Sequence, residues 1–173
     1  MGKVLSIVIL IAAVIAGGAL YYLQVYHFYD EARLASEGGE VEMRITLAGG
    51  QVIDLPVSDF RAIDAESSPI RFRACFTAHL PQDVGLVPYP AAEPLNAPSW
   101  FDCFDAKALG AALAEGRARA YLGEENIRYG IDRIIAISED GRGHAWHQIN
   151  RCGEKVFDGQ PAPEGCPQPP QGN

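Results

Sequence analysis

The four cysteines, Cys75, Cys103, Cys152 and Cys166, are the residues of this 173-residue chain whose chemistry is easiest to infer. They form no CxxC or CxxCH pattern, so the local signatures of thioredoxin-like redox chemistry and of covalent haem attachment are missing. Four cysteines in a small domain are typical of two disulfides in an oxidising compartment. Three pairings are possible, and we expect nearest neighbours along the chain to join, as Cys75–Cys103 and Cys152–Cys166.

The histidines give little support for a metal site. His144 and His147 are three residues apart on a predicted strand. They should therefore lie on opposite faces of the sheet, whereas two ligands on one strand need a spacing of two. No HExxH motif and no GxSxG elbow is present. We therefore expect no metal, no cofactor and no catalytic activity.

Two pairs of arginines could bind an anion. Arg71 and Arg73 share one face of a predicted strand, and Arg117 and Arg119 share one face of another. If these strands are neighbours, the four side chains form a guanidinium cluster for an anion or an acidic partner. Pairing with local carboxylates is the alternative. We favour it because acidic residues outnumber basic ones.

These candidate groups follow an apolar segment, residues 4–23, which contains no charged side chain. Twenty helical residues span roughly 30 Å, the thickness of the hydrocarbon core of a bilayer. Aromatic side chains of the kind found at headgroup level come next. They are Tyr21, Tyr22, Tyr26, Phe28 and Tyr29, which we call the collar. Residues 1–29 are thus expected to be a single membrane-spanning anchor with its collar.

A cleaved secretory signal peptide is the alternative, because small residues at 16–19 could form a cleavage site. The apolar run continues past them into the collar, which favours a retained anchor. Lys3 precedes the segment and Arg33 is the first basic residue after it, so the positive-inside rule leaves the N-terminus in the cytoplasm. This predicts a bacterial inner-membrane protein with a periplasmic domain.

One side of the predicted span carries small residues at a spacing of four. Ala12 and Ala16 form one pair, and Ala13 and Gly17 form the other. Such patterns allow a second helix to approach closely, although the same face could simply meet lipid. We favour a helix-packing face for a membrane-protein partner. All 22 acidic residues lie after the span, which argues against nucleic-acid binding.

The part of the chain after the collar has an α+β pattern. Residues 30–39 are interpreted as a stalk that ends at Gly38 and Gly39. Residues 40–47 and 51–57 alternate as a hairpin around Gly49 and Gly50, and residues 70–78 form a third strand. Residues 130–138 and 143–149 form a second hairpin. Its turn contains Asp140-Gly141, so the sheet should be antiparallel.

One helix is expected to pack on this sheet of five or six strands. Asp105 can cap a helix that runs to about residue 115. Residues 117–122 alternate as a strand, with a continued helix as the alternative. The domain should therefore cover residues 40–152. Residues 153–173 should form a proline-rich tail tied by the second disulfide.

Residues 80–99 are expected to form a long irregular loop. Five prolines interrupt it, Pro81, Pro88, Pro90, Pro94 and Pro98. Because proline lacks an N–H donor, we expect buried aromatic side chains, Trp100 above all, to hold the loop rather than hydrogen bonds. Phe101 and Phe104 should assist.

Several segments together resemble a family of short proteobacterial inner-membrane proteins whose domain has no assigned function. The segments are LYYLQVYHFYDE, IRFRACFTA, PSWFDCFDA, GRGHAWHQIN and RCGEKVFDG. The resemblance covers nearly the whole chain. It implies a single domain at the membrane and brings no catalytic residues.

An anchor, a collar and a small acidic domain without a catalytic motif favour a non-catalytic role. The leading hypothesis is an accessory or assembly subunit of a larger membrane complex, with respiratory complexes among the candidate hosts. The alternative is a periplasmic ligand-binding or redox-active domain that uses the arginine cluster or a labile disulfide.

Overall fold

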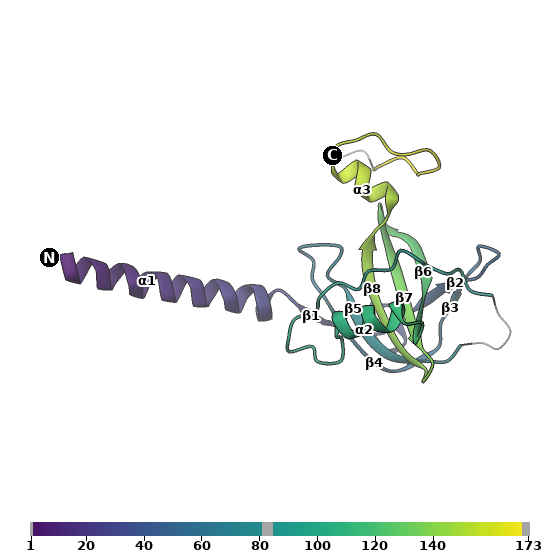
Figure 1. The fold of residues 1–173 in the computed structure, drawn as a ribbon, viewed down its shortest axis with the longest axis horizontal. Helices are drawn as coiled ribbons and strands as arrows, with labels where there is room; N and C mark the ends of the chain where they lie inside the picture. Colours follow the sequence, from purple (N-terminus) through teal and green to yellow (C-terminus); the bar gives the residue numbers. More distant parts are fainter. Residues whose placement is uncertain (1, 81–84, 171–173) are drawn as a thin grey trace.

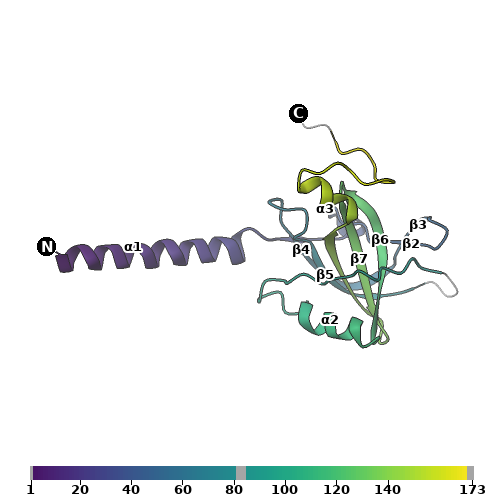
Figure 2. The same ribbon diagram turned by 45° about the horizontal axis from the view of Figure 1, so that its top comes forward.

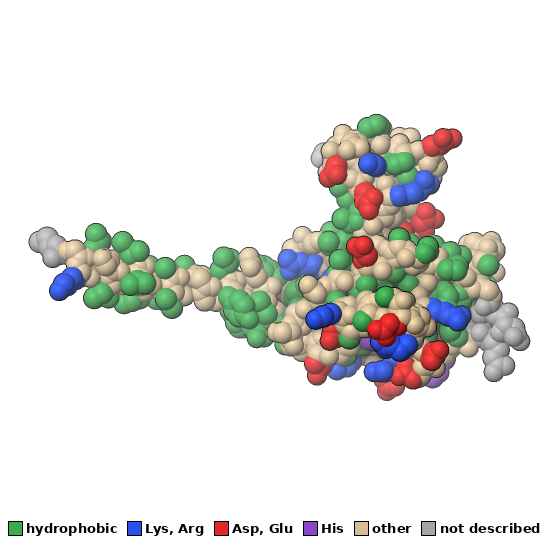
Figure 3. Space-filling view, viewed as in Figure 1, with side chains coloured by type: hydrophobic (Ala, Val, Ile, Leu, Met, Phe, Trp, Pro, Cys, Tyr) green, Lys and Arg blue, Asp and Glu red, His purple; other side chains and the backbone are tan. Residues whose placement is uncertain are grey.

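The computed structural model describes residues 2–80 and 85–170, and its most extended feature is an N-terminal helix (Figure 1). Helix α1, Gly2–Tyr22, continues into a π-helical turn, η1, Leu23–His27. No side chain of α1 is buried in the protein. In Figure 3 the side chains along the helix are mostly apolar, whereas charged groups of both signs are scattered over the domain. The 26 residues Gly2–His27 are long and apolar enough for a membrane anchor, and a signal sequence has the same character.

The domain is built on a six-stranded sheet in the order β1-β4-β5-β8-β7-β6. All neighbouring strands are antiparallel. The strands are β1 Asp30–Ala32, β4 Val57–Asp64, β5 Arg73–Ala78, β6 Ala118–Arg128, β7 Ile131–Ser138 and β8 Arg142–Ile149. A separate hairpin joins β2, Arg44–Thr46, to β3, Val52–Asp54. The helices are η2 Ala35–Glu37, α2 Ala106–Ala114 and α3 Arg151–Phe157, so the predicted α+β class is confirmed.

Apolar side chains cover both faces of this sheet. Along β7, Ile134 packs with α2 and the aromatic residues before it, whereas Ile135 packs under the β2–β3 hairpin. Trp146 is fully buried beside Ile134. Helix α2 runs alongside the sheet in both views (Figures 1 and 2). A sheet buried on both sides can place polar groups deep in the domain, where they need partners.

Several sequence predictions are confirmed. The first hairpin turns at Gly50, which has a φ of 81°, and the second turns at Gly141, with a φ of 83°. Such positive φ angles favour glycine. The Asp105 side chain caps α2 by accepting a hydrogen bond from the Ala108 N–H at 2.9 Å. Residues 118–128 form a strand rather than a continued helix.

The interpretation of residues 30–39 as a stalk is wrong. β1 pairs with β4 as the edge of the main sheet, with Asp30 opposite Asp64. Leu34 is only 8% exposed and joins the core, so apolar burial draws this segment into the domain. β4 itself was not predicted as a separate strand, because Pro56 was interpreted as the end of the preceding one. The described chain therefore passes from η1 into the sheet within two residues.

The prediction that residues 80–99 lack securing hydrogen bonds is also wrong, although residues 81–84 lie outside the described part. The Val87 N–H donates to the Thr46 carbonyl at 3.0 Å, and the Val87 carbonyl accepts from the Leu122 N–H at 2.9 Å. Tyr89 N–H donates to the Ala120 carbonyl. The segment thus lies between β2 and β6. The prolines on either side of Tyr89 leave these donors untouched.

The C-terminal segment contains a short helix that the sequence analysis did not predict. The Asn150 side chain caps α3 by accepting hydrogen bonds from the Cys152 and Gly153 N–H groups, both at 3.0 Å. Further along, the Tyr129 hydroxyl donates to the Pro167 carbonyl at 3.1 Å. The capped helix therefore begins the segment that had been predicted as tail.

Candidate functional site

Both predicted disulfides are present. Cys75 on β5 pairs with Cys103, with their Cα atoms 6.2 Å apart, and Cys152 pairs with Cys166 at 5.8 Å. Among the described residues no cysteine is free. The first bond ties the segment before α2 to the sheet and the second ties the tail to α3. Both have clear structural roles, and disulfides are typical of an oxidising compartment such as the periplasm.

The structure does not assemble the predicted guanidinium cluster. β5 and β6, which were expected to present the two pairs, are separated by β8 and β7. Arg71 lies over the ring of Tyr29, 5.4 Å from its centroid. Arg117 forms an exposed ion pair with Glu115 at 2.6 Å, and Arg119 is exposed. The four arginines therefore provide no shared anion site.

Arg73 has a structural role. It is 4% exposed, and its guanidinium donates to four backbone carbonyls. They belong to Leu95 at 2.8 Å, Asn96 at 3.0 Å, Ile70 at 2.8 Å and Phe72 at 2.7 Å. Burial lowers the pKa of Arg73 to about 10, so it stays charged at neutral pH. The side chain holds the proline-rich loop against the start of β5.

Trp100 joins the domain to η1, the end of the N-terminal helix. Its indole Nε1–H donates to the Val25 carbonyl at 2.7 Å. Its ring stacks on Tyr26 at a centroid distance of 6.5 Å and meets Tyr29 edge-on at 6.2 Å. The last carbonyls of a helix lack intrahelical partners, and Trp100 supplies one. Trp100 is 37% exposed, so the prediction that it is buried is wrong.

The four small residues of α1 are all exposed in the described chain. They are Ala12, Ala13, Ala16 and Gly17. A Cβ atom added to Gly17 would meet nothing within 4 Å. The surface on which a second helix could pack is therefore open in the described chain.

A further candidate site, which was not predicted, is a cavity of about 480 Å³ beside β1. Its lining includes Phe72, Arg133 and His147 from the main sheet and its approach, and Asp64 at the end of β4. Acidic side chains of β1, Arg128 at the end of β6 and charged residues of the neighbouring loops complete the wall. The cavity is large enough for a small molecule.

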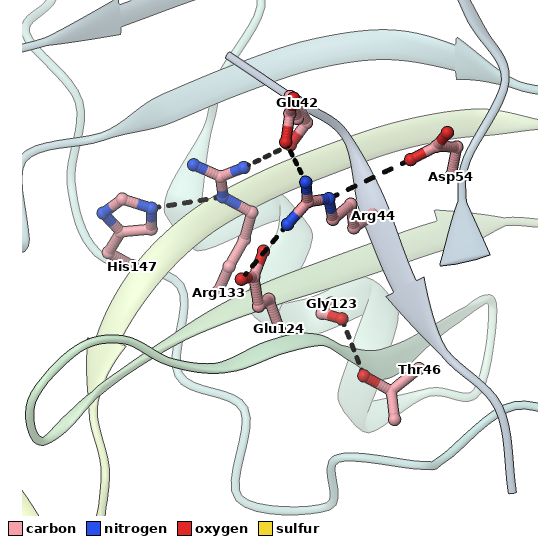
Figure 4. A network of polar contacts seen from close by, with 8 residues as sticks. All are labelled: Glu42, Arg44, Thr46, Asp54, Gly123, Glu124, Arg133 and His147. Carbon is pink, nitrogen blue, oxygen red and sulfur yellow. Dashed lines mark hydrogen bonds and ion pairs between the residues drawn. The ribbon is translucent and has the colours of Figure 1, made fainter. Parts of the chain in front are cut away.

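The geometry around Arg133 sets the protonation of His147 (Figure 4). Arg133 Nε donates to His147 Nε2 at 3.2 Å, while the other ring nitrogen, Nδ1, lies 2.8 Å from the Pro69 carbonyl. These contacts fit a neutral ring with its proton on Nδ1. Burial, assisted by the charge of Arg133, lowers the pKa of His147 to about 3. His147 is thus a neutral acceptor.

Arg133 is a buried cation without a close counter-ion. It is 6% exposed, lies over the Phe72 ring at 4.6 Å, and donates from Nη1 to the Glu42 carbonyl at 2.7 Å. No described carboxylate lies within 4.0 Å of it, and Glu124 pairs instead with Arg44 at 3.6 Å. Burial lowers the pKa of Arg133 to about 10. Arg133 was not among the predicted site residues, although a charge inside an otherwise apolar strand is a usable signal.

The histidines occupy opposite faces of β8, as predicted. His144 meets Phe104 edge-on on the side of α2, whereas His147 stacks on Phe72 at 4.7 Å on the other side. Within the described part of the chain, no three potential metal ligands come together.

Most of the domain matches a known protein family. A family model, DUF6446, described as a family of unknown function, matches residues 42–167. The chain belongs to DUF6446. The match includes both disulfides, Trp100 and Arg133, and begins after α1 and β1. The resemblance seen in the sequence is thereby confirmed as one to a domain of unknown function. No match was found among curated proteins or among solved structures.

Proposed function

We propose that this DUF6446 protein is a non-catalytic accessory or assembly subunit of a larger membrane complex, with respiratory complexes among the candidate hosts. In this proposal the anchor is retained, its N-terminus lies in the cytoplasm, and the domain lies in the periplasm. The observation that carries the proposal is the hydrogen bond from Trp100 to the Val25 carbonyl.

That contact supports a docking role because it restricts the orientation of the domain. Tyr26 and Tyr29 pack against Trp100 on two sides, and β1 starts directly after Tyr29. A domain held in this way presents the same surface at the membrane in every molecule. A subunit that must fit a neighbouring protein gains affinity from such preorganisation.

The anchor supports the same role. α1 runs without a break through the small residues at 16–19 and joins η1, which favours retention over cleavage. Its small face is open, and close approach through small residues is a common way for membrane helices to associate. The disulfides and the lack of basic residues immediately after the helix support the periplasmic orientation.

The experiment fills the small face and asks whether partners are lost. Ala13→Ile with Gly17→Ile keeps the length and apolar character of the span but adds bulk to that face. Val14→Ile with Gly18→Ile is the control, because each of these positions lies about 100° around the helix from its counterpart, on the side away from Ala12 and Ala16. Both variants should insert into the membrane.

After gentle solubilisation, the first variant should lose proteins that co-purify with the wild type, whereas the control should keep them. The same proteins and the same native mass for both variants would show that the span is only an anchor. Mass spectrometry of the purified chain tests retention in the same preparation. A chain that starts within or after residues 16–19 would contradict the anchor.

A further inference from the structure

Arg133 brings an uncompensated positive charge to the wall of the 480 Å³ cavity. Two of its nitrogens are used, Nε by His147 and Nη1 by the Glu42 carbonyl. The third, Nη2, has no hydrogen-bond partner among the described residues. Among the described residues, the side-chain polar atom that is both fully inaccessible to solvent and without a hydrogen-bond partner is His144 Nδ1, so Arg133 Nη2 is not fully inaccessible. Arg133 Nη2 is therefore open, and Arg133 lines the cavity.

The arginine is also held in place before any ligand arrives. Phe72 lies under the guanidinium at 4.6 Å and under the His147 ring at 4.7 Å. His147 in turn is tied to Pro69 at 2.8 Å. A guanidinium fixed in this way loses little entropy when it binds a carboxylate or phosphate oxygen, and charge-assisted hydrogen bonds are the strong ones.

The rest of the lining restricts which anion fits. Five carboxylates face the same cavity, and the basic residues beside Arg133 are Arg33 and Arg128. The five are Asp30, Glu31, Glu40, Asp64 and Glu66. Asp64 is the least exposed of them, and its carboxylate has no ion pair within 4.0 Å among the described residues. This excess of negative charge repels a ligand with several negative charges and attracts an ammonium group.

We propose that the cavity binds a small zwitterion, whose single oxyanion contacts Arg133 and whose ammonium group contacts the carboxylates of the wall, chiefly Asp64. Two sources supply this chemistry. One is a free amino acid or short peptide, and the other is the phosphoethanolamine headgroup of a membrane lipid. The headgroup is a candidate because β1, which lines the cavity, follows the collar directly. The site is independent of the accessory role.

Calorimetric titration of the full chain in detergent tests the proposal. The probes are the dipeptide alanylalanine, its C-terminal amide, its N-acetylated form and glycerophosphoethanolamine. At least one of the two zwitterions should bind saturably with one site per chain. If it is the dipeptide, the amide and the N-acetylated form should each bind at least tenfold more weakly. Preference for glycerophosphoethanolamine would assign the lipid source.

Two substitutions locate the binding. Arg133→Gln should weaken it roughly tenfold to hundredfold, since one or two charge-assisted hydrogen bonds are lost. Asp64→Asn keeps the acceptor for the Ala65 N–H, seen at 2.8 Å, but removes the charge, so a loss of about tenfold is expected. Asp64→Asn serves as the decisive variant if Arg133→Gln does not fold.

Arg61→Gln is the matched control. Arg61 pairs with Asp102 at 3.0 Å on the surface and does not line the cavity, so its variant should bind like the wild type. No saturable binding of either zwitterion would overturn the proposal. So would a blocked dipeptide that binds as well as the free one, or folded Arg133→Gln and Asp64→Asn variants with unchanged affinity.

Discussion

Arg73 and Arg133 are both buried, but they differ in role: Arg73 stabilises the fold, whereas Arg133 has a donor left for a ligand. They are 4% and 6% exposed, and burial lowers the pKa of each to about 10. Arg73 uses its guanidinium on four carbonyls, whereas Arg133 makes two hydrogen bonds and lines a cavity. Burial and pKa are thus almost the same for the two. What differs is how much of the donor capacity the fold already uses.

The largest expected effect comes from replacing Arg73, the arginine whose guanidinium nitrogens all donate within the fold. Arg73→Leu leaves four carbonyls without their donor and should lower the free energy of unfolding by about 3–5 kcal/mol. Denaturant unfolding of the full chain in detergent measures it. Hydrogen exchange at residues 95–97 should rise most. A loss below about 1 kcal/mol would contradict the structural role.

The neighbour of Arg133 gives a pH test. The pKa of His147 is about 3 in the fold, against about 6.5 when unfolded. Below about pH 6.5 His147 takes up a proton in the unfolded chain but not in the folded one. The contribution of the neutral His147 to stability is therefore full above this pH and is lost as the pH falls towards 3. Between pH 6.5 and 4.5 the loss should be about 2–3 kcal/mol.

His147→Gln is the control for this titration, because it keeps a polar side chain and cannot take up the proton. Its unfolding free energy should fall less than that of the wild type over the same pH range. Parallel pH curves for the two proteins would show that His147 is accessible to protons in the folded state. The hydrogen-bonded pair Arg133 and His147 would then be more accessible to solvent than in the structure.

Replacing Arg133, which makes only two hydrogen bonds, should lower the free energy of unfolding by less. Arg133→Leu leaves the Glu42 carbonyl and His147 Nε2 without a donor but also removes a buried charge. These effects oppose each other, so we expect a loss of about 1–2 kcal/mol in the same unfolding assay. A loss equal to that of Arg73→Leu would mean that both arginines are structural and would break the comparison.

The smallest expected effect is at the anchor. Trp100→Phe keeps an aromatic ring beside Tyr26 and Tyr29 but removes the donor to Val25. We expect about 1 kcal/mol of local destabilisation and little change in the unfolding of the sheet. Faster hydrogen exchange at residues 24–29 is the readout. Unchanged exchange there would show that the hydrogen bond to Val25 does not hold the domain.

The parts of the fold that local patterns encode could be predicted from the sequence. Alternation and the turns at Gly50 and Gly141 gave both hairpins, and Asp105 gave the start of α2. The pairing of Cys75 with Cys103 also followed from their order. These features depend on residues within a turn or on a few possible pairings.

The candidate sites depend on contacts between distant residues and were missed. Trp100 meets Val25 across 75 positions, and Arg133 meets Glu42 across 91. No periodicity contains such information. Strand order is the clearest case, because Arg73 and Arg119 do lie on the expected strands, β5 and β6, but β8 and β7 separate these strands. Arg71 and Arg117 lie just before those strands rather than on them.

The most direct test of the accessory role is the native mass of the wild-type protein after gentle solubilisation of its membranes. Our account predicts that the 18.7-kDa chain migrates in a larger assembly with at least one other membrane protein in a fixed stoichiometry. Cross-linking at the small face of α1 should join the chain to that partner. A chain that leaves the membrane alone, at the mass of a single copy with its detergent, would contradict the proposed function.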